Sequence, residues 1–309
     1  MIALRSLQRA ALPALGPSLL ALALLTSPSL AQQSYKSPED AAAALAAAVK
    51  SGPSDILKVL GRAADDIVSS GDEVADADIR QRFTSLYDQK HSIKAEGNKK
   101  ATLLLGPEDF PFPIPLENAK AGWEFNTAEG RIEVLRRRIG RNELDAIQTS
   151  LAYVDAQNEY ADKDHGEGVG VYAQRIVSTP GKKDGLFWRD DADPSPLGAL
   201  AAEASREGYR AGDLEPAPYH GYYFRILKGQ GPDAPGGALN YVVKGKMIGG
   251  FGLIAWPAEY GNSGVMTFLV NHNGVVYQKD LGPRTDFVAK RLMLFDPDQT
   301  WKKADAAKP

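Results

Sequence analysis

The first third of the chain carries apolar positions at helical spacing, and strand-like runs follow it. Ser37 stands before a proline and two acidic residues, which is typical of a helix N-terminus, and the alanine-rich run at 41–49 favours helix. Three helices are predicted, one from Ser37 to a stop at Gly52, one over 54–60 and one over 76–90. Strand character follows at 100–105, 109–116 and 122–125. Helices followed by a meander of strands indicate an α+β fold.

A long helical segment is predicted next, with Thr127 as its cap. Its apolar residues fall into two stripes, Ile132, Leu135 and Ile139, then Leu144, Ile147, Leu151 and Val154. Because the stripes are out of phase across Gly140, we expect a kink or two abutting helices, with Asn142 capping the second. Four arginines crowd this joint, at positions 136, 137, 138 and 141. They are interpreted as a solvated helix face or as an anion or partner contact.

The last third of the chain is dense in β-branched and aromatic residues. Five strands are predicted, over residues 222–227, 239–243, 251–256, 265–270 and 275–279. The pair Asn273-Gly274 between the last two is a strong hairpin signal. A loop-rich stretch at 162–218, interrupted by one helix over 196–209, precedes them. We therefore expect an antiparallel sheet with the long helix on one face.

The first residues have the features of a secretory signal peptide. Arg5 and Arg9 come before an apolar run at 19–25, and Ser29 and Ala31 are the small residues that a signal peptidase reads. We predict a signal peptide over residues 1–31 with cleavage after Ala31. The apolar run is too short to span a bilayer, so the mature chain is expected to be soluble, in the periplasm or secreted.

Composition and charge reduce the number of possible functions and partners. Hydrophobic residues make up 43% and charged residues 24%, which is typical of a globular protein. Of the 36 basic residues two lie in the signal peptide, so 34 face 39 acidic ones in the mature chain, and nucleic acid is not an expected partner. The lack of cysteine excludes thiol catalysis and disulfides. No cofactor is predicted, and no histidine pair has metal-ligand spacing, so no metal site is predicted either.

Two short motifs carry weak chemical signals. Residues 261–264, Gly-Asn-Ser-Gly, resemble the nucleophile loop of trypsin-like proteases, but no histidine stands in a matching context, and a tight turn is the better interpretation. Residues 162–168 resemble half of a calcium loop, although Ala173 occupies the position of the bidentate acid. A solvated acidic turn explains this segment better. No catalytic residues are therefore assigned.

Five stretches, at 151–157, 178–182, 221–223, 268–271 and 276–282, resemble an uncharacterised family of exported bacterial proteins, domain of unknown function 2950. The resemblance spans roughly residues 36–301 of the mature chain. It implies no activity, because the family has no established one.

Parts of the chain resemble other folds. Segments at 156–160, 170–175, 219–224, 264–270 and 273–277 resemble the soluble part of a type IV pilin or pseudopilin without its membrane helix. That resemblance implies a long helix on an antiparallel sheet, but not filament assembly. More loosely, residues 36–125 resemble a cystatin-like or nuclear-transport-factor-like layout. We expect two α+β domains, at 36–126 and 127–301, and a disordered tail at 302–309.

Three functions are weighed. The first is a non-enzymatic envelope protein that acts by contacts with a protein partner, through aromatic residues that can anchor an interface or simply belong to the core. The residues proposed for this surface are Trp188, Tyr219, His220, Tyr222 and Tyr223. The second is a small-ligand-binding periplasmic protein, with Trp123, Phe110 and Phe112 near the mouth of a cavity in the N-terminal part. The third is a periplasmic hydrolase that uses dispersed carboxylates or His220.

Overall fold

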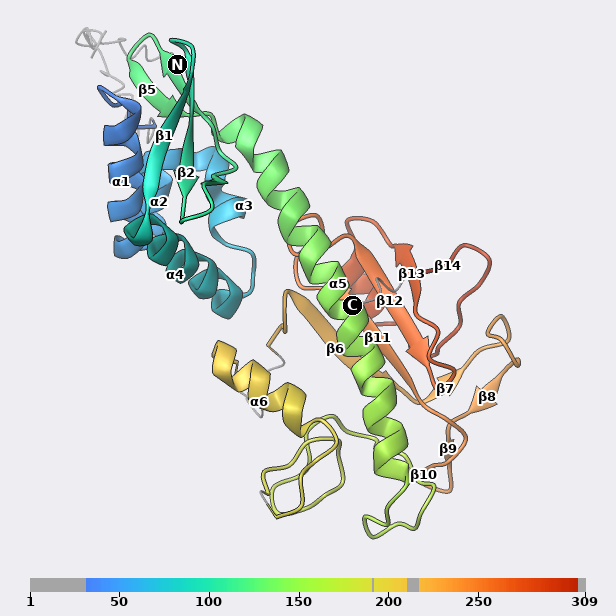
Figure 1. Cartoon of the computed structure of the whole chain (residues 1–309). Coiled ribbons are helices and arrows are strands. Elements are labelled where there is room, and N and C mark those ends of the chain that lie inside the picture. The colour runs from blue at the N-terminus through green and yellow to red at the C-terminus, as the bar shows by residue number, and fades with distance from the viewer. Residues whose placement is uncertain (1–31, 191, 210–216, 305–309) are drawn as a thin grey trace, which may run out of the picture.

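The computed structural model describes residues 32–190, 192–209 and 217–304 (Figure 1). The predicted signal peptide at 1–31 lies outside these residues, as do positions 305–309 of the predicted tail. The α+β class predicted from the sequence is confirmed, because helices and antiparallel sheets form both ends of the molecule. One long helix, α5 (Thr127–Ala161), runs from one end to the other (Figure 1).

The N-terminal part packs helices against an antiparallel sheet. The helices are α1 (Pro38–Ser51), α2 (Pro53–Leu60), the 3₁₀ turn η1 (Arg62–Ala64), α3 (Asp65–Val68) and α4 (Glu73–Gln89). The strands are β1 (His91–Glu96), β2 (Lys100–Leu105), β3 (Phe110–Pro111), β4 (Leu116–Ala119) and β5 (Gly122–Phe125), in the order β1-β2-β4-β5 with β3 beside β2. Their shared apolar core includes Leu45, Ile56, Phe83, Leu103, Leu116 and Phe125.

Capping side chains explain where these helices begin. Ser37 accepts a hydrogen bond from the N–H of Asp40, as predicted. The third helix starts at Glu73, three residues before its predicted start, because the Asp72 carboxylate accepts from the N–H of Ala75 and caps it. Strand β1 was not predicted, since its residues are mostly polar and exposed, and it forms by pairing along β2.

The long helix corrects the prediction of a kink or a break. Helix α5 continues through Gly140. Its N-cap is Asn126 and not the predicted Thr127, because the Asn126 side chain accepts a hydrogen bond from the N–H of Glu129. Asn142 starts no second helix; its side chain is buried and donates to the carbonyl of Ser263. The buried face runs along positions 130, 138, 142, 146, 150, 153, 157 and 160. Because polar residues occupy several of these positions, the apolar stripes alone misplace the face.

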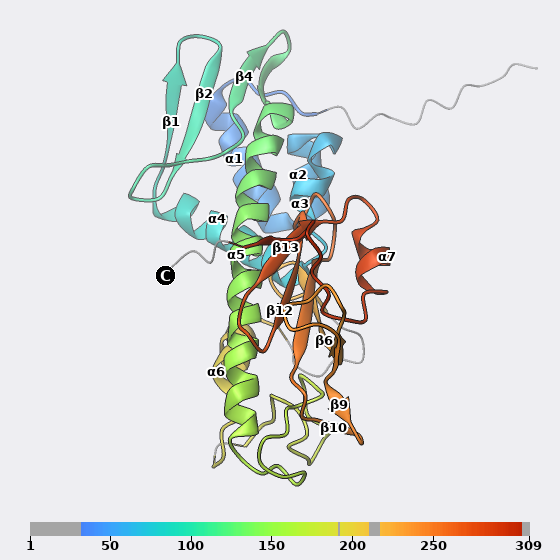
Figure 2. The ribbon, with the colours of Figure 1, turned by 90° about the vertical axis from the view of Figure 1, so that its right-hand side faces the viewer.

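The C-terminal part is a five-stranded antiparallel sheet that is covered on both faces. Its strands are β6 (Tyr222–Leu227), β11 (Gly252–Pro257), β12 (Met266–Asn271), β13 (Tyr277–Asp280) and β14 (Lys302–Lys303), in the order β14-β13-β12-β11-β6. One face packs on α5, and the other packs on the segment that contains α7 (Thr285–Ala289) (Figures 1 and 2). The hairpin predicted at Asn273-Gly274 joins β12 to β13.

Two predicted segments differ from the structure here. Lys302 and Lys303, assigned to the disordered tail, form β14 by pairing with Gln278 and Tyr277. The predicted strand at 239–243 is not part of the large sheet. It divides into β8 (Leu239–Asn240), which pairs with β7 (Gly229–Gln230), and β9 (Val242–Val243), which pairs with β10 (Lys246–Met247). The left-handed residues Lys244 and Gly245 form the tight turn that folds β9 back on β10.

Helix α6 (Gly198–Glu207) lies within the range predicted for it, at the side of α5 (Figure 1). Among the described residues, no helix offers the long apolar stretch that crossing a bilayer requires.

Candidate functional site

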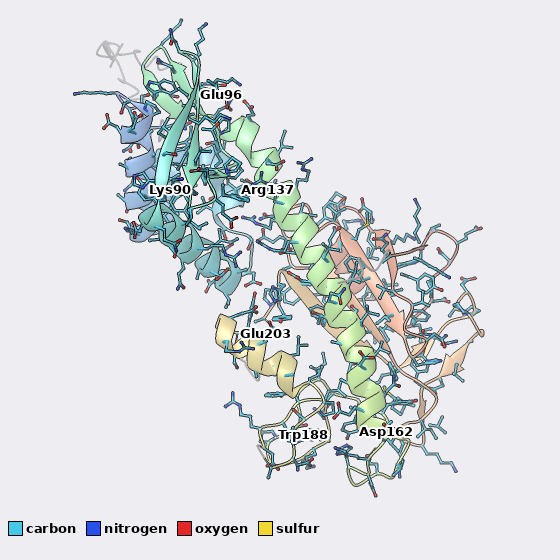
Figure 3. The ribbon with its side chains drawn as sticks, viewed as in Figure 1. Lys90, Glu96, Arg137, Asp162, Trp188 and Glu203 are labelled. Atoms are coloured by element: carbon cyan, nitrogen blue, oxygen red, sulfur yellow. The ribbon has the colours of Figure 1, made fainter. Side chains whose placement is uncertain are left out.

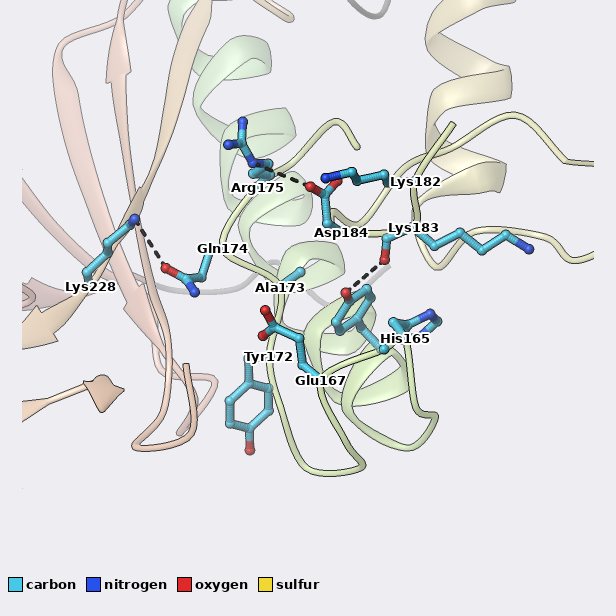
Figure 4. Close-up of a pocket in the computed structure, with 12 residues that line it drawn as sticks. His165, Glu167, Tyr172, Ala173, Gln174, Arg175, Lys182, Lys183, Asp184 and Lys228 are labelled. Carbon is cyan, nitrogen blue, oxygen red and sulfur yellow. Dashed lines mark hydrogen bonds and ion pairs between the residues drawn. The ribbon is translucent and has the colours of Figure 1, made fainter. Parts of the chain in front are cut away.

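A cavity of about 720 Å³ lies where α5 ends (Figure 4). Its walls come from the last turn of α5, from the loop that follows it up to Asp184, and from Lys228 directly after β6. Figure 3 places this end of the molecule, marked by Asp162 and Trp188, far from the N-terminal sheet, marked by Glu96. The cavity volume lies in the range of sites for small organic molecules.

A buried glutamine holds the loop that lines the cavity. The side chain of Gln157 is fully buried and donates to the carbonyl of Ala173 at 2.8 Å, while it accepts from the N–H of Ala173 at 2.9 Å. On the other side of the loop, the N–H of Tyr172 donates to the carbonyl of Met247 at 2.8 Å. The segment at 171–175 is therefore fixed between α5 and the β9–β10 hairpin.

Stacked aromatic rings form a second wall. The rings of Tyr160 and His165 lie 4.0 Å apart, and His165 lies 5.4 Å from the ring of Trp188. The hydroxyl of Tyr160 donates to the carbonyl of Lys183 at 2.8 Å. Burial, with the nearby charges of Glu167 and Asp184, raises the pKa of Tyr160 to about 12. Burial also lowers the pKa of His165, which favours a neutral imidazole at pH 7.

Cationic side chains occupy the rim of the cavity. Arg175 lies 3.9 Å from the Asp184 carboxylate, which also accepts two hydrogen bonds from Thr179. Among the described residues, the Lys228 ammonium donates only to the neutral Gln174, at 3.3 Å. The Lys182 ammonium has no ion-pair or hydrogen-bond partner within the described part of the chain, and only its backbone N–H donates, to the carbonyl of Thr179. Figure 4 shows Arg175 and Lys182 beside Asp184, Lys228 beyond Gln174, and Lys183 directed away from these side chains.

The acidic loop at 162–168 forms the side of the cavity that faces these cations. The Asp164 carboxylate accepts from the N–H groups of Gly166 and Gly168, and these bonds lower the pKa of Asp164. Asp164 thus helps to shape this turn. Across the described ranges, no group of three or more histidine, aspartate or glutamate side chains converges as a metal site requires.

The structure does not bring the predicted aromatic surface together. Tyr222 is fully buried, with its hydroxyl donating to the carbonyl of Met266, and Tyr223 lies on the other face of the sheet beside Trp256. Trp188 is also buried and donates to the carbonyl of Asp193. These three positions fit the alternative interpretation of the sequence, in which the aromatic residues belong to the core and not to an interface. Trp188 does not line the cavity, but its ring lies 5.4 Å from that of His165, which does.

Tyr219 and His220 lie at a different place, between α5 and α6. The His220 imidazole stands 3.6 Å from the Asp145 carboxylate and 3.2 Å from that of Glu207. It occupies a tight turn with left-handed backbone, φ 48°, next to Gly221. Its ring packs at 4.2 Å from that of Tyr219. His220 therefore links two helices and does not line the cavity.

The predicted N-terminal aromatic residues have structural contacts. Phe112 packs edge to face with Phe83 and Phe125 inside the N-terminal core. The backbone of Trp123 pairs with that of Tyr35, and its side chain packs on the same core. Phe110 is exposed and lies beneath the Arg137 guanidinium. The cavity described above lies at the other end of the molecule.

The serine of the motif at 261–264 is fully buried. Its hydroxyl accepts from the N–H of Glu259 and donates to the carbonyl of the same residue. The motif is the tight turn that the sequence favours, with Ser263 as an internal brace.

The cavity was not predicted from the sequence, although the sequence contained a partial signal for two of its residues. Arg175 and Lys182 stand in two of the stretches that carry the family and fold resemblances, inside a long loop-rich segment. Long loops without secondary structure in a compact protein often carry function. Lys228 has no such signal, because only the fold brings it to the loop.

Comparisons with known proteins give one match. A family model with the description "Protein of unknown function (DUF2950)" covers residues 32–304. No curated protein and no solved structure matches the chain. The family predicted from the sequence is thus confirmed, whereas the pilin-like resemblance stays a prediction.

Proposed function

We propose that this chain, which belongs to the family described as "Protein of unknown function (DUF2950)", binds a small anionic ligand in the cavity at the end of α5. The observation that carries this proposal is that Arg175, Lys182 and Lys228 all line this cavity, with a single ion pair among them, from Arg175 to Asp184. The protein acts as a non-enzymatic binding protein of the cell envelope, as its predicted export implies.

Electrostatics supports an anion at this rim. Like charges that gather at a cavity repel one another, and the walls of a cavity focus their field. An anion that receives hydrogen bonds from Lys182 and Lys228 replaces this repulsion with charge-assisted contacts. The fixed loop between Gln157 and Met247 keeps the rim in place before a ligand arrives, which lowers the entropic cost of binding.

We expect Lys182→Glu to weaken anion binding at least about tenfold, because a charge-assisted hydrogen bond contributes about 1.5–3 kcal/mol. Isothermal titration calorimetry with citrate and with inorganic phosphate measures the effect. Lys163→Glu is the matched control, since it makes the same charge change on an exposed lysine of the same loop outside the cavity lining. Equal loss in both variants would point to a general charge effect and contradict the proposal.

A second candidate function is the contact with an envelope protein partner, favoured by exposed apolar side chains around α7. Phe287, Met293 and Leu294 are 52%, 64% and 44% exposed. The Arg291 guanidinium lies 3.4 Å from the centre of the Phe287 ring. Large apolar residues with an arginine are typical of interface anchors.

For this candidate, the double variant Phe287→Ser and Met293→Ser is expected to abolish recovery of a stoichiometric partner. In-cell crosslinking followed by affinity purification from the native envelope measures this recovery. Val169→Ser is the control, because Val169 is 70% exposed but belongs to the loop after α5. If the double variant recovers the same partner as the unchanged protein, α7 is not the contact surface.

A further inference from the structure

We propose that the ligand of this cavity is zwitterionic, and that the Glu167 carboxylate binds its cationic amine while the rim of Arg175, Lys182 and Lys228 binds its anionic group. This inference rests on the proposed function and names the class of ligand. It assigns Glu167 as the residue that selects between a simple anion and a molecule with both charges.

Glu167 is placed by its backbone and is free at its side chain. Its carbonyl accepts from the Lys246 ammonium at 2.6 Å, which ties this part of the loop to the β9–β10 hairpin. Within the described residues its carboxylate has neither an ion-pair nor a hydrogen-bond partner. Figure 4 shows the carboxylate directed into the cavity, on the side opposite Arg175 and Lys182. Tyr160 lies nearby in the cavity wall, and the Glu167 charge contributes, after burial, to its raised pKa.

The two charged sides set a requirement for the ligand. A purely anionic molecule gains contacts at the rim but meets repulsion from Glu167, which the nearby Asp184 does not relieve because Asp184 is also acidic. A molecule with an amine at one end and an anionic group at the other satisfies both sides at once.

The volume of the cavity suits a ligand larger than a single inorganic ion. About 720 Å³ accommodates a short peptide with free ends or a phosphorylated amino sugar. Both sources share the same chemistry, an ammonium group and an anionic group on one small scaffold. The test therefore uses a matched pair of probes from each source.

Calorimetric titration compares trialanine with N-acetyl-trialanine, and glucosamine 6-phosphate with glucose 6-phosphate. In one of the two pairs, the unchanged protein is expected to bind the amine-bearing probe at least about tenfold more tightly than its partner. Glu167→Gln is expected to remove this preference without weakening the probe that lacks the amine. Glu159→Gln, an exposed carboxylate of α5 outside the cavity lining, is expected to keep the preference.

The outcomes separate this inference from the proposed function. A preference in the peptide pair identifies a peptide source, and a preference in the sugar pair identifies an amino-sugar source. If citrate or glucose 6-phosphate binds but neither pair shows a preference for the amine-bearing probe, the inference is overturned and anion binding stands. The same holds if Glu167→Gln keeps that preference. If no probe binds, citrate and phosphate included, the proposed function fails as well.

Discussion

Replacing Arg138 with methionine is expected to lower the free energy of unfolding by about 3–5 kcal/mol, because it leaves three acceptors without their donor at a cost of about 1–3 kcal/mol each. Arg138 is only 5% exposed. It donates to the carbonyl of Asp66 at 2.8 Å, to that of Ile67 at 2.6 Å, and to the side chain of Asn262. Methionine keeps much of the volume but supplies no donor, so all three acceptors lose their partner in a buried place.

The position of these acceptors makes the loss large. Asp66 and Ile67 belong to α3, whereas Asn262 belongs to the turn that precedes β12. The Arg138 guanidinium on α5 thus binds both to α3 in the N-terminal part and to the turn before β12 in the C-terminal part. Asn262 in turn donates to the carbonyl of Ser69, which extends the same contact.

Urea denaturation followed by circular dichroism measures the change as a shift of the midpoint Cm. Arg137→Met is the matched control, since Arg137 is the preceding residue of α5 but is exposed, with an ion pair to Glu133 and a contact to the Phe110 ring at the surface. Its midpoint is expected to stay close to that of the unchanged protein. Midpoints that fall together in both variants would contradict a special role for Arg138.

The second large effect is expected from Asp72→Asn, at about 2–3 kcal/mol of unfolding free energy. The Asp72 carboxylate is 2% exposed and accepts three hydrogen bonds. One oxygen accepts from the N–H of Ala75 and caps α4, while the other accepts from the Tyr209 hydroxyl at 2.8 Å and from the N–H of Gly221 at 2.9 Å. Asparagine can keep the cap, but its amide nitrogen then faces two donors.

Asp78→Asn is the control for this change, because Asp78 lies on the same helix and is exposed, with a long ion pair to Arg82. The loss of cooperativity is a second readout. Tyr209 and Gly221 belong to the C-terminal part, so the variant is expected to let the N-terminal part unfold at a lower urea concentration. Asp72→Asn with an unchanged midpoint and a single transition would disprove the proposed coupling.

Local pattern predicted most elements correctly. Helices α1, α2 and α6, strands β2, β5, β6, β11, β12 and β13, and the hairpin at Asn273-Gly274 fall where periodicity and turn residues place them. Caps, prolines and β-branched runs act within a few residues, so a single sequence contains the information. The predictions of a disordered tail at 302–303 and of a single strand at 239–243 were wrong. The structure at each place depends on which distant segment a short stretch pairs with.

The candidate site depended on the fold. Lys228 follows a strand, whereas Arg175 and Lys182 lie in a loop, and no spacing rule relates them. The aromatic cluster near His220 attracted attention in the sequence, yet it divides between the core, the far face of the sheet and the α5–α6 junction. Aromatic residues are frequent in cores, so their sequence pattern alone does not identify a surface.

The sequence by itself determined the α+β class, the family and most helices and strands, because these follow from short-range preferences and from a pattern that spans the chain. Only the tertiary structure decided which polar side chains are buried. Arg138, Asn142 and Gln157 form part of the inner face of α5, and their partners are Asn262, Ser263 and Ala173. Burial of a polar group is tolerated only where a partner meets it, and distant segments supply those partners when the chain folds.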